Sequence, residues 1–191
     1  MVKLILASNS PRRKKIMTDL GLDFEVIPSN YDEKLDSDEF NYEKIEDLAT
    51  QKCLDVVRRS DNDSLVLSAD TVVVLHNKIL GKPHSKEDAF RMLKSLSGQT
   101  HSVVTSICAI NTKTNRAVTM STTSYVRFTQ WTDEMIHCYI DKFNPLDKAG
   151  SYGIQELPPN YLDKFEGSFE NIVGLCPESV MTVLQKLEYH P

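Results

Sequence analysis

The sequence has no long apolar run and none of the commonest loop motifs of catalysis. No apolar stretch approaches the roughly 18–20 residues that cross a bilayer, so no membrane partner is expected. A G-x-S-x-G motif, a Walker A loop and a G-x-G-x-x-G fingerprint are all missing, so serine-hydrolase, P-loop and Rossmann interpretations lack support. Seven glycines and eight prolines among 191 residues are too few for a fibrous or low-complexity chain. These absences leave an ordinary globular protein.

The four cysteines are spread too widely to form a recognisable metal or redox motif. They are Cys53, Cys108, Cys138 and Cys176, with no C-x-x-C pair and no histidine at zinc-finger spacing. Near the N-terminus a basic run at 11–15 follows the apolar stretch, whereas a signal peptide places its charges first. We therefore expect reduced thiols and a cytoplasmic location.

The charge balance argues against large anionic partners. The chain carries 22 Lys or Arg and 27 Asp or Glu, a formal net charge of −5. Nucleic acids and anionic membranes favour a surplus of basic residues, so no nucleic acid is expected as a partner. A small phosphorylated ligand is compatible with this balance, because only a few basic side chains need to converge in one cleft.

Apolar runs separated by polar residues predict alternating strands and helices. Strands are expected at 3–7, 23–28, 65–75, 101–110 and 117–129, and helices at 11–20, 43–59, 85–97, 132–142 and 178–188. Turn-like segments at 76–78 and 111–115 predict that the later strands are antiparallel. The pattern indicates one α/β domain over residues 1–191, with a central twisted mixed sheet flanked by helices.

A first candidate site follows the first strand, in Ser8-Asn9-Ser10-Pro11-Arg12-Arg13. Ser10 is a favourable N-cap and Pro11 a favourable first helical residue, so a helix should begin here. The amides of a helix start attract anions, and arginine can bind two phosphate oxygens at once. Both arginines oppose the helix dipole, which favours a binding role. A capped surface helix with solvated charges is the alternative.

A second candidate is Asp70, which interrupts the apolar strand at 65–75. A buried carboxylate is costly unless it is paired or binds a metal, although it can also accept hydrogen bonds at a bulge. Lys82, in the turn Gly81-Lys82-Pro83, offers a cation. So does Lys52, which lies on the apolar stripe of the helix at 43–59. Lys52 either extends along the helix edge or enters a cleft to meet an anion.

Two other positions are less distinctive by themselves. Glu33, with Asp32, falls in the polar stretch 29–44 and could supply a carboxylate to a divalent metal, although such pairs are usually solvated. His101 begins a strand and is expected to be a core or edge histidine.

A last candidate is the glycine-containing segment at 147–155. Its two glycines allow a ligand to approach the backbone closely, although a simple turn would also use them. The segment adds a charge, an aromatic ring with a hydroxyl, and an amide that can read the edge of a base: Lys148, Tyr152 and Gln155.

Taken together, these segments resemble the Maf family of nucleoside triphosphate pyrophosphatases. The resemblance spans nearly the whole chain and rests on short motifs in the family's order: Leu4-Ile5-Leu6-Ala7-Ser8-Asn9-Ser10-Pro11-Arg12-Arg13, Glu33, Lys52, Ala69-Asp70-Thr71, Gly81-Lys82-Pro83, Leu96-Ser97-Gly98-Gln99-Thr100-His101, the segment 147–155, and Asn171-Ile172-Val173-Gly174-Leu175. It implies an elongated α/β fold with two lobes around a cleft, similar to the inosine triphosphate pyrophosphatases. The family is usually dimeric, so a homodimer is expected.

The resemblance also implies a reaction and its residues. Family members use a divalent metal, here Mg²⁺ or Mn²⁺, and cleave a nucleoside triphosphate between the α- and β-phosphates. The catalytic residues would be Asp70, Lys52 and Lys82, and the metal ligands Asp70 and Glu33. The substrate would be bound by Ser8, Ser10, Arg12, Arg13, Thr71, Lys148 and Gln155. Arg12, Thr71 and Gln155 match the branch that prefers dTTP and UTP, which implies hydrolysis of these, and of modified pyrimidine nucleotides, to the monophosphate and pyrophosphate.

Two departures from the family pattern concern substrate preference more than the reaction. Glu156 stands where the family usually has glycine, and Cys176 interrupts its Gly-Leu-Pro. Two alternatives stay open: a nucleotide-binding regulator of cell division with little turnover, and a pyrophosphatase for inosine or 7-methyl-GTP nucleotides.

Overall fold

The computed structural model describes residues 2–31 and 37–189. Its strands are β1 (Lys3–Leu6), β2 (Glu25–Val26), β3 (Ser64–Leu75), β4 (Lys78–Leu80), β5 (Thr100–Asn111), β6 (Ala117–Phe128) and β7 (Leu162–Glu166). Its helices are α1 (Pro11–Asp19), α2 (Tyr42–Val57), α3 (Lys86–Leu96), α4 (Asp133–Phe143), α5 (Phe169–Val173) and α6 (Pro177–Lys186). Three short 3₁₀ turns follow α4: η1 (Pro145–Asp147), η2 (Ala149–Ser151) and η3 (Ile154–Glu156).

All the strands join one mixed sheet, which confirms the predicted fold class. The strand order is β2-β1-β3-β5-β6-β7, and β4 also pairs with β3. β1 runs parallel to β2 and β3, whereas the later pairs are antiparallel. The expected hairpin between β3 and β4 turns at His76 and Asn77, both with positive φ, as tight hairpin turns require. The turn expected between the two long strands β5 and β6 is also present.

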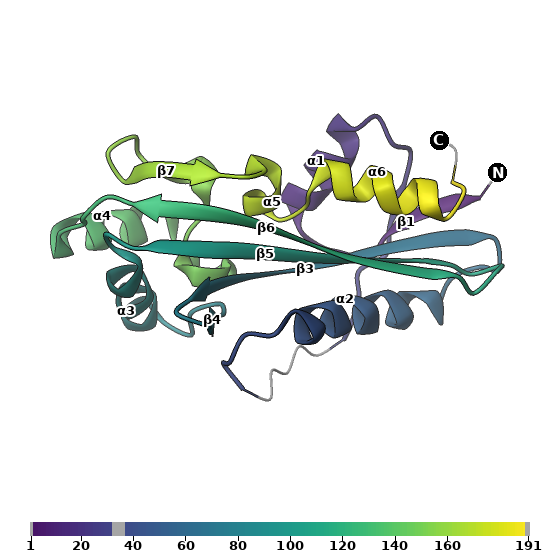
Figure 1. Ribbon diagram of the computed structural model, residues 1–191, viewed down its shortest axis with the longest axis horizontal. Helices are drawn as coiled ribbons and strands as arrows, with labels where there is room; N and C mark the ends of the chain where they lie inside the picture. The colour runs from purple at the N-terminus through teal and green to yellow at the C-terminus, as the bar shows by residue number, and fades with distance from the viewer. Residues whose placement is uncertain (1, 32–36, 190–191) are drawn as a thin grey trace.

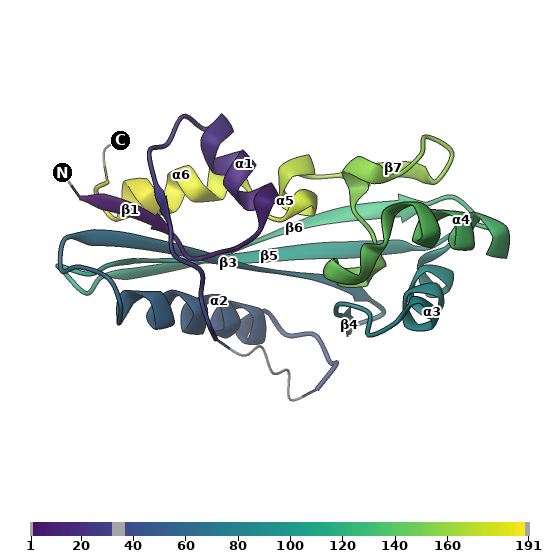
Figure 2. The ribbon, with the colours of Figure 1, turned by 180° about the vertical axis from the view of Figure 1, so that it is seen from behind.

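Helices cover both faces of the sheet. α2 lies on one face, and α1, α5 and α6 lie on the other (Figure 1). Side chains alternate along β3, so even-numbered residues face α2: the Ser68 hydroxyl donates to the Ala49 carbonyl of that helix (2.5 Å). Odd-numbered residues such as Leu67 pack with Val180 of α6 on the opposite face. The segment after α4 also lies against β3 (Figure 2), where Gly150 contacts Val73.

One edge of β3 lacks a partner strand in its middle. β1 pairs with residues 64–67 of β3 and β4 pairs with residues 73–75. At 68–72, the part of the chain that the structure describes places no strand on this edge. Asp70 lies in this gap. Because no described strand covers the edge here, side chains from both faces of β3 can border the same open space.

The gap also leaves backbone groups of β3 without ladder partners. The Leu67 carbonyl accepts a hydrogen bond from the Ala7 N–H, just beyond β1 (2.7 Å). Carbonyls two residues apart in a strand point to the same edge, so the Ala69 carbonyl faces the gap. A buried carbonyl needs a hydrogen-bond donor, and here it must come from outside the sheet.

Several elements differ from the sequence-based expectation. β2 spans only Glu25–Val26 within the expected 23–28, and β7, α5 and the three 3₁₀ turns were not predicted. Four of the five β7 residues are exposed, so this strand lacks the apolar run that marks the others. Among the described residues, no helix is long and apolar enough to cross a membrane.

Candidate active site

A cleft of about 400 Å³ opens at the gap in β3. Its walls come from the loop between β1 and α1, from α2 and β3, and from the segment after α4. Every predicted site residue that the structure describes lines it: Ser8, Ser10, Arg12, Arg13, Lys52, Asp70, Thr71, Lys82, Lys148 and Gln155. Glu33, the other predicted residue, lies outside the described residues, as does Asp32.

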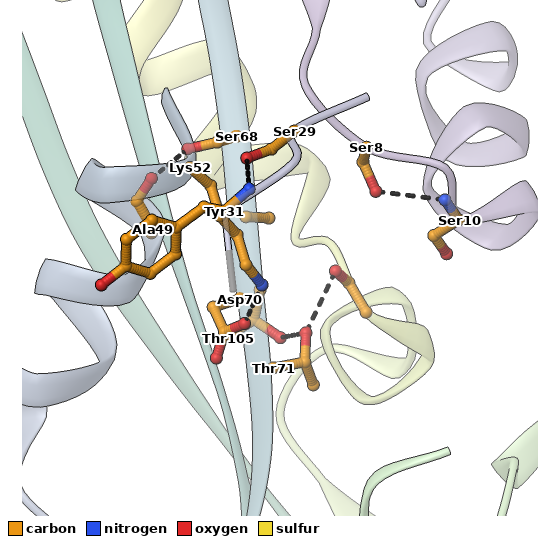
Figure 3. A network of polar contacts seen from close by, with 12 residues as sticks. Ser8, Ser10, Ser29, Tyr31, Ala49, Lys52, Ser68, Asp70, Thr71 and Thr105 are labelled. Atoms are coloured by element: carbon orange, nitrogen blue, oxygen red, sulfur yellow. Dashed lines mark hydrogen bonds and ion pairs between the residues drawn. The ribbon is translucent and has the colours of Figure 1, made fainter. Parts of the chain in front are cut away.

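Asp70 and Lys52 form a buried ion pair in this cleft. Lys52 Nζ donates to Asp70 Oδ1 (Figure 3), and the lysine and aspartate side chains are only 10% and 7% exposed. Lys52 points inward because it shares the buried stripe of α2 with Leu48 and Val56. Separating the two members of a buried ion pair leaves each charge uncompensated, which is strongly unfavourable. This cost keeps both side chains in place. Asp70 Oδ2 has no hydrogen bond to any described residue, which leaves that oxygen for a water molecule or a ligand.

Arg13 fills the gap in the sheet. Its Nε donates to the Gly174 carbonyl (2.9 Å) and its Nη1 to the Ala69 carbonyl (2.8 Å). Nη1 also lies 3.4 Å from Ser8 Oγ, and Nη2 donates to Thr71 Oγ1 (3.0 Å). The guanidinium group thus supplies donors where a neighbouring strand is missing. Arg13, predicted to bind substrate, is built into the framework of the cleft.

Thr71 belongs to the same network as Arg13. Its hydroxyl lies 2.9 Å from the Thr105 hydroxyl (Figure 3), and Thr105 donates to the Asn171 carbonyl (3.1 Å). Asn171 is fully buried, and its side-chain amide donates to the Val103 carbonyl (3.1 Å). Sequence reasoning missed Thr105, and it quoted Asn171 only as part of a family motif, without a role. A polar side chain inside the apolar run at 101–110 was the available signal for Thr105.

Arg12 contacts the opposite wall of the cleft. Its Nη1 pairs with Asp147 Oδ2 (3.1 Å), and Asp147 Oδ1 accepts from Lys148 Nζ (2.9 Å). Lys148 Nζ also lies 3.4 Å from Glu156 Oε2, so the ammonium, on a side chain 8% exposed, sits between two carboxylates. Burial raises the pKa of Asp147, but hydrogen bonds from Lys148 and Arg12 outweigh it and hold the pKa below its usual value. Glu156, noted as a departure from the family pattern, is therefore in direct contact with the site.

The start of α1 and the loop after β4 complete the polar end of the cleft. Ser10 Oγ accepts from the Arg13 N–H (3.4 Å), which confirms the predicted N-cap, and Ser8 Oγ accepts from the Ser10 N–H (3.1 Å). Lys82 is exposed at the rim and forms no ion pair with a described residue. This end therefore combines helix amides, hydroxyls and cations, the groups that bind phosphate.

Part of the cleft wall, called the apolar end below, is formed by four residues of one hydrophobic cluster. Val73 of β3, Val103 of β5, Ile172 of α5 and Tyr152 line it, and all four are buried. Gly150, two residues before Tyr152, packs against Val73 of β3. It has a φ of +66°, and a Cβ atom there would lie 2.8 Å from Val73 Cγ2, so a larger residue would not fit.

The oxygen donors of the cleft fit a magnesium ion that is bound together with a substrate. Among the described residues, no group of three His, Cys, Asp or Glu could hold a metal without other ligands. Mg²⁺ commonly uses one or two carboxylates, waters and substrate phosphates. Asp70, with one oxygen on Lys52 and one without a described partner, matches that use.

The fold and the cleft define a class of protein: an α/β protein in which a buried carboxylate lies among cations that converge from distant segments, as in enzymes acting on phosphorylated ligands. The family follows from comparison with known proteins. The chain belongs to the Maf family, because the family model described as "Maf-like protein" matches residues 3–187.

Similar proteins carry a consistent name. A dTTP/UTP pyrophosphatase of Caldicellulosiruptor saccharolyticus is 42% identical over 192 residues, covering 99% of this chain and 96% of the relative. One from Clostridium perfringens (strain SM101) is 43% identical over 98% of each chain. A third, from Bdellovibrio bacteriovorus, is 40% identical over 96% of this chain and 97% of the relative. A solved nucleoside-triphosphatase / dITP/XTP pyrophosphatase from Mycobacterium abscessus shares 14% identity and a TM-score of 0.48, over 96% of this chain and 94% of that chain.

Proposed function

We propose that this chain hydrolyses dTTP and UTP between the α- and β-phosphates, releasing the nucleoside monophosphate and pyrophosphate. The observation that carries the proposal is the buried Asp70–Lys52 pair at the open edge of β3, inside a cleft rich in cations. The names of the relatives support dTTP and UTP as substrates. Arg12, Thr71 and Gln155, which the family resemblance links to that preference, line the same cleft.

The triphosphate would occupy the polar end of the cleft. A triphosphate is a polyanion, so its hydrolysis depends on charge neutralisation and positioning more than on a covalent nucleophile. Arg12 and Lys82 are the cations best placed for its oxygens, because Arg12 reaches across the cleft and Lys82 is exposed at the rim. Arg13 would act indirectly, by holding the Thr71 hydroxyl and the Ala69 carbonyl around the substrate.

Asp70 would serve as the general base. The water oxygen forms a bond to the attacked phosphorus, its proton moves to Asp70 Oδ2, and the anhydride bond breaks with its electron pair on the leaving group. Lys52 keeps Oδ1 engaged and so directs Oδ2 toward the cleft. Asp70 and Glu33 are the residues that would hold Mg²⁺, which when bound would neutralise phosphate charge. The metal and the water proton would compete for Asp70 Oδ2, since a metal-bound carboxylate is a weaker base.

A nucleotide panel tests this proposal. Purified protein with Mg²⁺ is incubated with dTTP, UTP, the purine triphosphates, inosine triphosphate and 7-methyl-GTP, and pyrophosphate release is measured. We expect the highest kcat/KM with dTTP and UTP. Release from a purine nucleotide alone would contradict the substrate assignment, and tight binding without turnover would instead favour the regulatory alternative.

Replacing Asp70 by asparagine tests the base. We expect kcat to fall at least about 100-fold, because a positioned general base contributes roughly 10²–10⁴ in rate. Asp163→Asn is the matched control, since Asp163 is half-exposed on β7 and pairs only with Arg127 among the described residues. A near-wild-type rate in the Asp70 variant would remove Asp70 from the mechanism.

A further inference from the structure

A buried histidine and a buried tyrosine meet behind the apolar end of the cleft. His101 Nε2 lies 2.7 Å from the Tyr152 hydroxyl, and the two side chains belong to residues that are 2% and 6% exposed. Both rings pack edge-on against Phe128, with centroid distances of 4.9 Å for His101 and 4.8 Å for Tyr152. The Tyr152 ring is therefore fixed at its hydroxyl and along its side, while it also lines the cleft.

Both members of this pair are neutral near pH 7. Burial lowers the pKa of His101 to about 3. Burial, with the neighbouring Tyr139, raises the pKa of Tyr152 well above its usual value. Neither group is placed to bind phosphate or to exchange protons with a substrate, so their contribution is to the shape of the cleft.

The shape of the apolar end is set by rigid contacts. Gly150 lies directly against Val73, and Tyr152 follows two residues later with its hydroxyl on His101. The whole cleft measures about 400 Å³, near the lower end of the roughly 300–1,000 Å³ of small-molecule sites. Because the Tyr152 ring is held in place and the cleft is small, the ring limits the size of the group that fits beside it.

We propose that Tyr152 is a specificity-determining residue that restricts the apolar end to a single-ring base, and that His101 is the positioning residue that fixes Tyr152. The inference rests on the proposed function and names the feature that would select its pyrimidine substrates. With the triphosphate held at the cationic end, the base is the part of the nucleotide that suits the apolar end. Tyr31, the other aromatic residue of the cleft in the described chain, donates its N–H to Ser29 Oγ (Figure 3) and is exposed, whereas Tyr152 is buried.

The physical basis is exclusion of the second ring of a purine. A purine can enter only if the tyrosine ring moves, and that movement breaks the hydrogen bond to His101 and the packing on Phe128. Breaking a buried hydrogen bond leaves polar groups unsatisfied, which is unfavourable. His101 and Tyr152 therefore disfavour purine binding by limiting the space at the apolar end, and not by hydrogen bonding to the edge of the base.

Substitution of Tyr152 by leucine and by alanine tests the proposal. We expect the ratio of kcat/KM for dGTP to that for dTTP to rise at least tenfold, within the range over which apolar pockets discriminate. Tyr152→Phe is the matched comparison: it keeps the ring and its packing on Phe128 but loses the hydrogen bond to His101, so its ratio should rise only as far as that of His101→Leu and stay below that of the leucine variant of Tyr152. A loss of rate shared equally by all nucleotides in the leucine variant, with an unchanged ratio, would overturn the proposal. The leucine variant retains more volume than the alanine variant, so it covers the case in which alanine does not fold.

His101 is tested by the same ratio. His101→Leu removes the hydrogen bond and should relax the preference, whereas His101→Gln keeps a polar partner for the Tyr152 hydroxyl and should restore it. An unchanged preference in the leucine variant would remove His101 from its positioning role. Calorimetric binding of dTMP and dGMP to each variant separates this inference from the proposed reaction. If the wild-type protein releases no pyrophosphate, the proposed reaction is wrong. The role of Tyr152 is then still decided by whether its substitution changes the ratio of the affinities for dTMP and dGMP.

Discussion

Replacing Arg13 by lysine should destabilise the protein, whereas the same change at Arg12 should not. Arg13 joins two buried carbonyls, those of Ala69 and Gly174, through a planar group with several donors. Lysine keeps the charge but has one ammonium, which cannot occupy the Nε and Nη1 positions at once. At least one carbonyl, and the Thr71 hydroxyl, then lose their donor.

The size of the effect follows from these contacts. A buried polar group left without its partner costs about 1–3 kcal/mol, so loss of two such contacts costs about 2–6 kcal/mol. For a chain of this length, 1 kcal/mol shifts the melting temperature by about 2–4 °C, so the Arg13 variant should melt about 4–24 °C below wild type. The Arg12–Asp147 pair is 28% and 60% exposed, so it contributes at most about 1 kcal/mol and about 4 °C.

Thermal unfolding by circular dichroism, at equal protein concentration and without nucleotide, measures both variants. Truncation of Arg12 should instead affect substrate binding. Arg12→Ala should raise KM for dTTP while the melting temperature stays near that of wild type. Equal melting temperatures for the wild type and the Arg13→Lys variant would refute the idea that Arg13 replaces a missing strand. A larger loss of stability in the Arg12→Lys variant than in the Arg13→Lys variant would refute it as well.

Two further predictions concern charge. Glu156→Gln should lower KM for dTTP by up to about fivefold at low salt, the factor that corresponds to a pair worth about 1 kcal/mol, because the Lys148 ammonium then keeps only Asp147 as a carboxylate partner and is more available to phosphate. The difference should shrink in high salt, and an unchanged KM at low salt would contradict it. The depressed pKa of His101 predicts acid sensitivity: the unfolded chain binds a proton near pH 6.5 and the folded protein only near pH 3, so stability is full above pH 6.5 and is lost on acidification. The loss at pH 5 should be about 2 kcal/mol in urea unfolding, and His101→Gln should remove it; equal losses in both proteins would count against the assignment.

Strong local signals made most of the fold predictable from sequence. The twelve-residue strands β3, β5 and β6 are long apolar or alternating runs, and α1 begins where Ser10 and Pro11 indicate. β7 and α5 carry weaker signals, because β7 is mostly exposed and α5 has five residues. Such elements form because they pack on β6 and β5, and that context is absent from their own sequence.

The positions of the site residues were more predictable than their contacts. Arg12 and Arg13 are adjacent in one motif and look equivalent, yet one pairs with Asp147 across the cleft and the other donates to the Gly174 carbonyl. Those partners lie more than 130 residues away, so no local pattern separates the two arginines. Lys148 shows the same limit, because its pairing with Glu156 depends on how η2 and η3 fold back on each other.

The gap in the sheet explains how consecutive residues come to share one site. Asp70 and Thr71 point to opposite faces of β3, so alternation alone would place them on different sides of the protein. Asp70 meets Lys52 of α2 on one face, and Thr71 meets Arg13 of α1 on the other. Both still line one cleft, because β1 ends before them and β4 begins after them, which leaves the edge of β3 open between the faces. The Asp70–Lys52 pair on one face and the Arg13–Thr71 network on the other therefore border one cleft only because of this opening. A continuous neighbouring strand along this edge of β3 would leave Asp70 and Thr71 in place but would separate the two faces, so the two residues could no longer line one cleft.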